Sequence, residues 1–283
     1  MSWDPGHFER PSQTEWRPAD PEPVPHPSPP QRHWLRRLLA PVIAAGLLLW
    51  KVIGPLLIAI KSIKFLSTGV TFLVSIAAYA TIWGWRFAVG FTVLLFIHEM
   101  GHVLQLRREG VPFTAPLFIP FLGAFVGMKQ LPENAYVEAK VGLAGPVIGT
   151  LGAAACFALA VTIDSDLLRA VSYTGFFLNL INLIPVLPLD GGRAAAAFHP
   201  AFWFVGLFVV ALLFFLHHNL ILLLILLLGG YELYNRWSRR HDPESRAYHQ
   251  TTWRQRLTIG AVYIGLVVVL VVGMDASYIH REL

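Results

Sequence analysis

The stretch Phe87–Leu106 reads FAVGFTVLLFIHEMGHVLQL and is predominantly apolar, with a group of ionisable side chains in its second half. About 20 such residues are enough for a helix to cross the roughly 30 Å hydrocarbon core of a bilayer. His98 and His102 are four residues apart, so a helix places both imidazoles on one face. Ionisable side chains inside such a helix are costly unless they face a polar interior. The stretch therefore predicts a membrane-spanning helix that carries a functional site.

The ionisable group has the spacing of a metal site. His98, Glu99 and His102 form the pattern H-E-x-x-H. Two imidazoles on one helix face can bind one zinc ion, whose bonds to nitrogen are about 2.0–2.1 Å long. Glu99 follows the first histidine, where its carboxylate can act as the general base towards an attacking water molecule. The alternative is a buried polar cluster that only joins helices.

The composition of the whole chain is that of a membrane protein. Of the 283 residues, 55% are hydrophobic and 14% are charged, and the mean hydropathy is +0.56. Soluble domains contain about 25% charged residues, so the composition argues against a soluble enzyme. The net charge of +5 is small for this length and argues against a nucleic-acid partner.

Other apolar runs resemble the first one. With it, the predicted spans cover residues 65–84, 87–106, 141–163, 167–187, 201–216, 220–234 and 257–274. The runs 201–216 and 220–234 are short, and they form a spanning hairpin only if their polar link lies at the membrane interface. The pattern predicts an all-α polytopic membrane protein with about seven transmembrane helices.

The chain divides into four parts by composition. Residues 1–33 hold nine of the 20 prolines and predict a disordered cytoplasmic tail. Residues 34–64 are basic at both ends and carry Lys51 in the middle of their apolar run, which favours an interfacial or membrane-associated helix over a span. Residues 65–193 are expected to form a catalytic membrane core. Residues 194–283 are expected to add transmembrane helices and a basic cytoplasmic loop.

The positive charges predict the orientation of the chain. They cluster at Arg32/Arg36/Arg37, Lys61/Lys64, Arg107/Arg108, Arg236/Arg239/Arg240 and Arg254/Arg256. Seven spans with a cytoplasmic N-terminus place every cluster on the cytoplasmic side, and the loop 164–166 outside. The sequence thus predicts a multi-pass protein of the cell membrane.

A catalytic zinc usually has three protein ligands, so two histidines leave one to be found. Asp190 follows an apolar run that Pro185 and Pro188 break, and Gly191 and Gly192 come directly after it. Broken helices at membrane depth are tolerated where they line a cavity. In the predicted topology Asp190 lies at the same depth as the two histidines. The alternative is that Asp190 only caps the next helix, and weaker candidate ligands are His199, His217 and His218.

The two motifs together resemble the site-2 protease family of intramembrane zinc metalloproteases. H-E-x-x-H in one span is followed by Asn-x-x-Pro-x-x-Pro-Leu-Asp-Gly-Gly over residues 182–192. The resemblance implies one zinc ion per chain, with His98, His102 and Asp190 as ligands and Glu99 as the catalytic base. It implies that Asn182 lines the substrate cleft. The family also carries a Gly-Pro motif in the intervening span, matched by residues 145–146, for which close helix packing is a compatible explanation.

The segment 111–130 contains three prolines and two glycines among large apolar residues, a spacing that forbids a regular spanning helix. In the family this region forms a re-entrant strand-like loop beside the zinc. A substrate helix must be unwound before cleavage, and an edge strand can pair with its exposed backbone groups. The alternative is a plain interfacial loop.

These observations predict an intramembrane zinc metalloprotease that hydrolyses peptide bonds of membrane-anchored protein substrates, as in regulated intramembrane proteolysis. Its expected partners are a membrane-spanning substrate and the lipid bilayer, with no nucleic acid. One rival is a membrane zinc transporter, which needs a polar pathway open to both sides. The other is a catalytically inactive membrane scaffold, against which the intact Glu99 argues.

Overall fold

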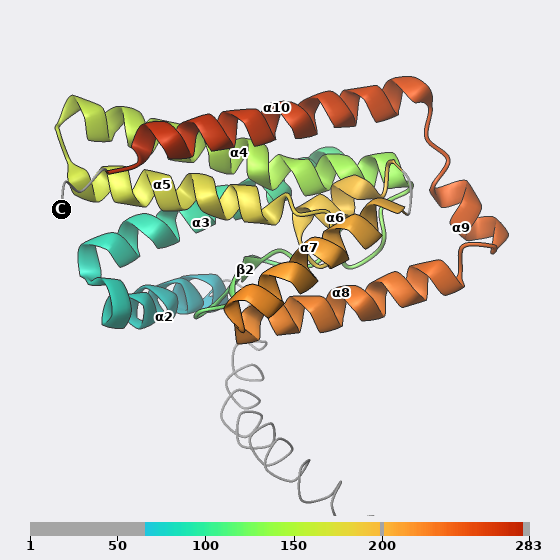
Figure 1. Ribbon diagram of the computed structural model, residues 1–283, viewed down its shortest axis with the longest axis horizontal. Coiled ribbons are helices and arrows are strands. Elements are labelled where there is room, and N and C mark those ends of the chain that lie inside the picture. Colours follow the sequence, from blue (N-terminus) through green and yellow to red (C-terminus); the bar gives the residue numbers. More distant parts are fainter. Residues whose placement is uncertain (1–65, 199–200, 280–283) are drawn as a thin grey trace, which may run out of the picture. The chain divides into compact units, whose positions relative to one another are not determined.

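The computed structural model of the protein describes residues 66–198 and 201–279, and most of these are helical (Figure 1). The long helices are α2 (Leu66–Trp83), α3 (Trp85–Arg108), α4 (Ala135–Thr162), α5 (Asp166–Asn182), α7 (Ala201–His217), α8 (Leu220–Ser238) and α10 (Trp253–Ser277). The short helices are α6 (Asp190–Ala195) and α9 (Pro243–Tyr248), and the strands are β1 (Leu117–Ile119) and β2 (Gly123–Phe125). The predicted tail, 1–33, and the predicted interfacial helix, 34–64, lie outside the described residues.

The helices have the length and composition of membrane helices. Among the described residues, α3, α4, α8 and α10 are long and apolar enough to cross a bilayer, and α2 and α7 include shorter apolar helices. This confirms the prediction of an all-α polytopic membrane protein. The number of about seven spans stays a prediction.

Helix α4 begins six residues before the predicted start at Val141. Asn134 caps it by accepting a hydrogen bond from the backbone N–H of Val137 at 3.0 Å. Its first two turns contain Glu138 and Lys140, which hydropathy assigns to a loop. Both charges are neutralised by partners from other segments, Glu109 directly after α3 and Arg236 of α8, so the polar turns remain helical.

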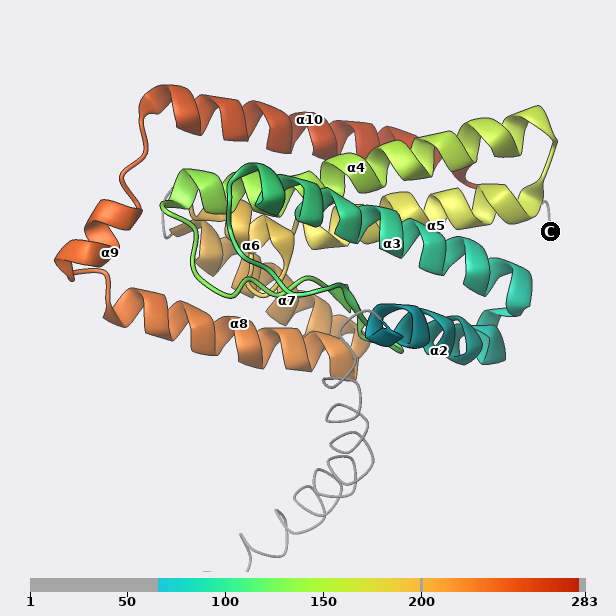
Figure 2. The same ribbon diagram turned by 180° about the vertical axis from the view of Figure 1, so that it is seen from behind.

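Helix α4 contacts the helices α3, α5, α6 and α10. Helices α4, α5 and α10 lie side by side in both views, and α2 folds back along α3 (Figures 1 and 2). The shared core of α4, α5 and α10 includes Leu143, Phe176 and Leu270. At Gly101 a Cβ atom would overlap the carbonyl of Ala144, so only glycine lets α3 and α4 come this close.

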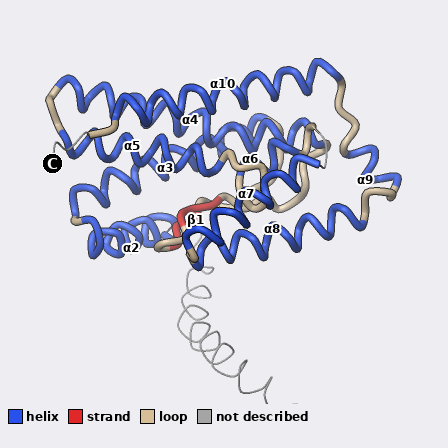
Figure 3. Tube along the Cα trace, in the orientation of Figure 1, coloured by secondary structure: helices blue, strands red, loops and turns tan. Residues whose placement is uncertain are grey.

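The segment between α3 and α4 forms a β-hairpin (Figure 3). Strands β1 and β2 pair antiparallel, and the pairing continues as an isolated bridge between Phe113 and Met128. Phe118 of β1 is 1% exposed and packs edge-on against Phe72 of α2, which fixes the hairpin on the bundle. The predicted strand-like loop at 111–130 is therefore present, in place of a plain interfacial loop.

Candidate metal centre

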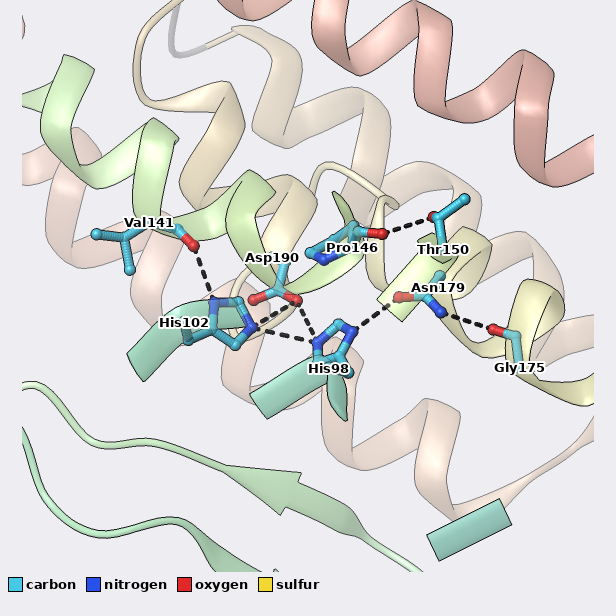
Figure 4. Close-up of polar contacts among 8 residues, drawn as sticks. All are labelled: His98, His102, Val141, Pro146, Thr150, Gly175, Asn179 and Asp190. Atoms are coloured by element: carbon cyan, nitrogen blue, oxygen red, sulfur yellow. Dashed lines mark hydrogen bonds and ion pairs between the residues drawn. The ribbon is translucent and has the colours of Figure 1, made fainter. Parts of the chain in front are cut away.

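Helix α3 and helix α6 bring three potential ligand atoms together (Figure 4). The Nε2 atoms of His98 and His102 are 3.2 Å apart. Oδ2 of Asp190 lies 3.0 Å from Nε2 of His98 and 3.2 Å from Nε2 of His102. All three side chains are buried. The structure thus joins two motifs that are about 90 residues apart in the sequence.

The donor set fits zinc. With bonds of about 2.0–2.1 Å, the ligand atoms of a tetrahedral zinc lie about 3.3–3.4 Å apart, close to the 3.0–3.2 Å found here. Glu99 also has a carboxylate oxygen within 4.8 Å of a ring nitrogen of each histidine. Its Oε2 atom is buried and has no hydrogen-bond partner among the described residues.

Neighbouring groups orient both imidazoles. Nδ1 of His102 donates to the carbonyl of Val141 at 2.8 Å, because a carbonyl oxygen can only accept. Asn179 donates its Nδ2 to the carbonyl of Gly175 at 2.7 Å and turns its Oδ1 to Nδ1 of His98 at 2.8 Å. Both neutral rings then carry their proton on Nδ1 and present a lone pair at Nε2.

This tautomer makes the cluster a site for a cation. The two Nε2 lone pairs and the Asp190 carboxylate oxygen are all acceptors, and they converge within 3.2 Å of one another. Buried acceptors at this distance repel one another unless a positive charge lies among them. A metal ion among the three atoms would satisfy all of them, and the geometry is suited to one.

Glycines on α4 make room for the centre. A Cβ atom on Gly145 would overlap Nε2 of His102, and one on Gly149 would overlap Oδ1 of Asn179. The Gly145–Pro146 motif is thus a site of close packing against His98 and His102.

Helix α6 presents Asp190 at its first residue. Leu189 is the N-cap residue, and no side chain caps the helix. The carboxylate of Asp190 instead lies 3.0 Å from Nε2 of His98 and 3.2 Å from Nε2 of His102. The structure thus gives no support to the alternative in which Asp190 serves only as a cap. Trp203 of α7 fixes the helix by donating its indole N–H to the carbonyl of Gly192 at 2.8 Å.

The centre opens into a cavity of about 350 Å³. His98, Glu99, His102 and Asp190 lie on its wall together with Arg193. Strand β2 contributes its whole length to the wall, and α8 contributes an apolar face that includes Leu224 and Leu228.

Asn182, the predicted cleft residue, also lines this cavity. Sequence reasoning missed Asn179, which orients His98 from one turn earlier on α5. The feature that could have indicated Asn179 is a polar amide inside the apolar helix α5. Of the weaker candidate ligands, His199 lies outside the described residues. His217 and His218 lie at the link between α7 and α8 and do not line the cavity.

A second polar cluster, which no sequence pattern indicated, is formed by Glu138, Arg236 and Tyr248. Glu138 is 1% exposed and accepts hydrogen bonds from Arg236 at 2.8 and 3.3 Å and from the Tyr248 hydroxyl at 2.8 Å. Burial, together with the Glu138 carboxylate, raises the pKa of Tyr248 well above its usual range, so the hydroxyl remains a donor. Arg236 also lies over the ring of Trp203, the residue that holds Gly192. The cluster therefore connects the end of α8, through Trp203, to helix α6, which carries Asp190.

A known protein family matches the part of the chain that contains the H-E-x-x-H motif. The model of Peptidase family M50 matches residues 86–173. The M50 match contains the H-E-x-x-H helix and the Gly-Pro motif, and it confirms the resemblance to the site-2 protease family. The match ends before Asn182 and Asp190, whose places beside the histidines are seen in the structure alone.

Two curated relatives are named as zinc metalloproteases. A zinc metalloprotease of Methanocaldococcus jannaschii is 29% identical over 155 residues, which is 53% of this chain and 44% of the relative. Rip3 of Mycobacterium tuberculosis, also named as a zinc metalloprotease, is 28% identical over 138 residues, or 44% of this chain and 34% of the relative. The matched region thus spans less than half the length of these relatives. Together with the M50 match they indicate zinc as the metal.

Proposed function

We propose that this protein is an intramembrane zinc metalloprotease that hydrolyses peptide bonds of membrane-anchored protein substrates, as in regulated intramembrane proteolysis. The observation that carries the proposal is the convergence of three buried acceptor atoms beside Glu99 on the wall of one cavity. The M50 match and the names of the relatives support the same reaction class.

In this proposal His98, His102 and Asp190 hold one zinc ion per chain. The bound ion supplies a Lewis acid for the scissile carbonyl and favours ionisation of the attacking water. Glu99 takes a proton from that water and later transfers it to the leaving amine. Its Oε2 atom is suited to this role because no described residue occupies it as a hydrogen-bond partner. Asn182 contributes an amide to the cavity wall, where it can hold substrate backbone.

Strand β2 is the element proposed to bind the unwound substrate. It pairs with β1 on one side only, in a two-stranded sheet of the described residues, and its residues Gly123–Phe125 line the cavity. The backbone of an unwound segment can add to this strand by β-augmentation. Zinc transport does not require a strand that binds peptide backbone. Most of the remaining cavity wall is apolar, so it offers no polar pathway for an ion.

We further propose that the basic end of the bundle is cytoplasmic. The end of α3 and the start of α4 meet there through the Glu109–Lys140 ion pair, and the Glu138–Arg236 pair adds the end of α8. The link between α4 and α5 lies at the opposite end of α4 (Figure 1). Single cysteines introduced by Ser238→Cys and by Ser165→Cys, each with Cys156→Ala, are expected to react with impermeant maleimide from opposite sides. Ser238→Cys should react from the cytoplasmic side and Ser165→Cys from outside. Reaction of Ser165→Cys only from the cytoplasmic side would refute this orientation.

The replacement Glu99→Gln tests the proposed reaction. The zinc ligands remain in this variant, so we expect about one zinc per chain and a loss of cleavage of about 10²–10⁴-fold. The assay is cleavage of a co-expressed panel of single-span proteins, with zinc content measured on the purified variant. Undiminished cleavage by Glu99→Gln would remove the protease proposal, and loss of zinc would show that Glu99 is a ligand.

A further inference from the structure

Arg193 is a cation on the wall of the proposed catalytic cavity. It lies on α6, three residues after Asp190, and it is half-buried. Its guanidinium takes part in no hydrogen bond or ion pair with any described residue. Other cations near this end of the bundle differ: Arg236 and Lys140 are paired with glutamates, and Arg239 and Arg254 are exposed.

The apolar surroundings of Arg193 favour the binding of an anion beside its guanidinium. It is the only arginine or lysine among the described residues that line the cavity, and most of the other lining side chains are apolar. A cation in such a wall is costly unless a negative charge pairs with it. The Asp190 carboxylate faces both histidines as a proposed zinc ligand, and Glu99, on which the Arg193 charge acts from a distance, is the proposed base. Neither acid forms an ion pair with Arg193, so among the described residues the guanidinium is left for an incoming anion.

The backbone of Arg193 is held in place. A Cβ atom on Gly142 of α4 would lie 2.8 Å from Cβ of Arg193, so the two helices are in close contact at this residue. The carbonyl of Gly192, one residue earlier, accepts the indole N–H of Trp203. The guanidinium therefore extends from a fixed point, and its five N–H donors match the two oxygens of a carboxylate.

We propose that Arg193 determines substrate specificity by pairing with an acidic side chain of the substrate, near the bond to be cut. This inference rests on the proposed protease function and names its substrate class: single-span proteins with an Asp or Glu inside the apolar segment. Such a residue also weakens the substrate helix, because Asp has low helix propensity and a charge is costly in lipid. Recognition of the acid by Arg193 would select segments that unwind readily.

The test compares matched Asp and Asn substrates. In a reporter that the wild type cleaves and Glu99→Gln does not, successive positions around the cut carry Asp or Asn. At one position we expect the wild type to prefer Asp about tenfold or more in kcat/KM, as for a charge-assisted hydrogen bond. Arg193→Gln should abolish this ratio, and Arg193→Glu should favour Lys at the same position. Arg254→Gln, on an exposed arginine of α10, should keep the wild-type ratio.

The ratio separates specificity from damage to the fold, because a poorly folded variant loses activity on both substrates alike. Cross-linking of the Asp and Asn substrates to the Glu99→Gln protein gives a second readout that needs no turnover, and the Asp substrate should be captured more strongly. No Asp preference at any position, or a preference that survives Arg193→Gln, would overturn the role of Arg193. If the wild type cleaves no single-span reporter but the Glu99→Gln protein still captures Asp substrates more strongly than Asn substrates, the protease function is refuted and the acidic recognition stands.

Discussion

Asp190→Asn is expected to fold and to lose zinc. Asparagine keeps the size of the side chain but removes the negative charge that faces the two Nε2 atoms. Changing a group that only orients a ligand typically costs about 10–100-fold in metal affinity, so loss of a direct ligand should cost more than about 100-fold. Cleavage should fall with the zinc. Titration against a competing chelator measures the affinity, and circular dichroism checks the fold.

The same substitution separates the two roles considered for Asp190. Asparagine is as good an N-cap as aspartate, so a residue that only capped α6 would tolerate the change. Asp190→Glu tests the geometry, since the extra methylene displaces the carboxylate from its contacts with both histidines. Wild-type zinc affinity and cleavage in Asp190→Asn would reject Asp190 as a ligand.

Gly145→Ala is expected to disrupt the metal centre by adding a single methyl group. The new Cβ would overlap Nε2 of His102, whose ring cannot turn away without losing its bond to the Val141 carbonyl. Either the imidazole or helix α4 must move, and the spacing of the ligand atoms is lost. We expect zinc affinity to fall at least about 10–100-fold, the cost of disturbing ligand orientation, with a matching loss of cleavage.

Gly265→Ala is the matched control. Gly265 lies inside α10, and a Cβ there would meet nothing within 4 Å. Alanine favours helix over glycine, so this variant should fold, bind zinc and cleave as the wild type does. If Gly145→Ala also bound zinc normally, the close approach of α4 to His102 would be wrong.

Local spacing was enough to predict which side chains lie together. The i, i+4 interval places His98 and His102 on one face of a helix whatever the rest of the fold. The prolines before Asp190 and the glycines after it indicated a broken helix end at the same depth, and the carboxylate does lie beside the histidines. That the three side chains bind a metal ion stays a prediction. The three prolines of segment 111–130 excluded a helix and left the strand-like loop that the structure shows.

What escaped prediction depends on how helices turn towards one another. Asn179 and Asn182 are both polar residues of one apolar helix, and only the rotation of α5 against α3 places Asn179 on His98. Glu138 and Arg236 are 98 residues apart and read as ordinary loop charges, yet they form a buried pair. The spacing of residues within one helix cannot predict such a contact, because the contact forms only when α4 packs near α8.

The most direct test of the central claim is to locate the bond that is cut and the oxygen that is added. The purified protein and a single-span substrate are placed in liposomes in water enriched in ¹⁸O, and the products are weighed by mass spectrometry. We expect a cut inside the apolar segment, with one ¹⁸O atom in the new carboxylate, and no such product from zinc-loaded Glu99→Gln. A cut outside that segment, or equal product from Glu99→Gln, would contradict the claim.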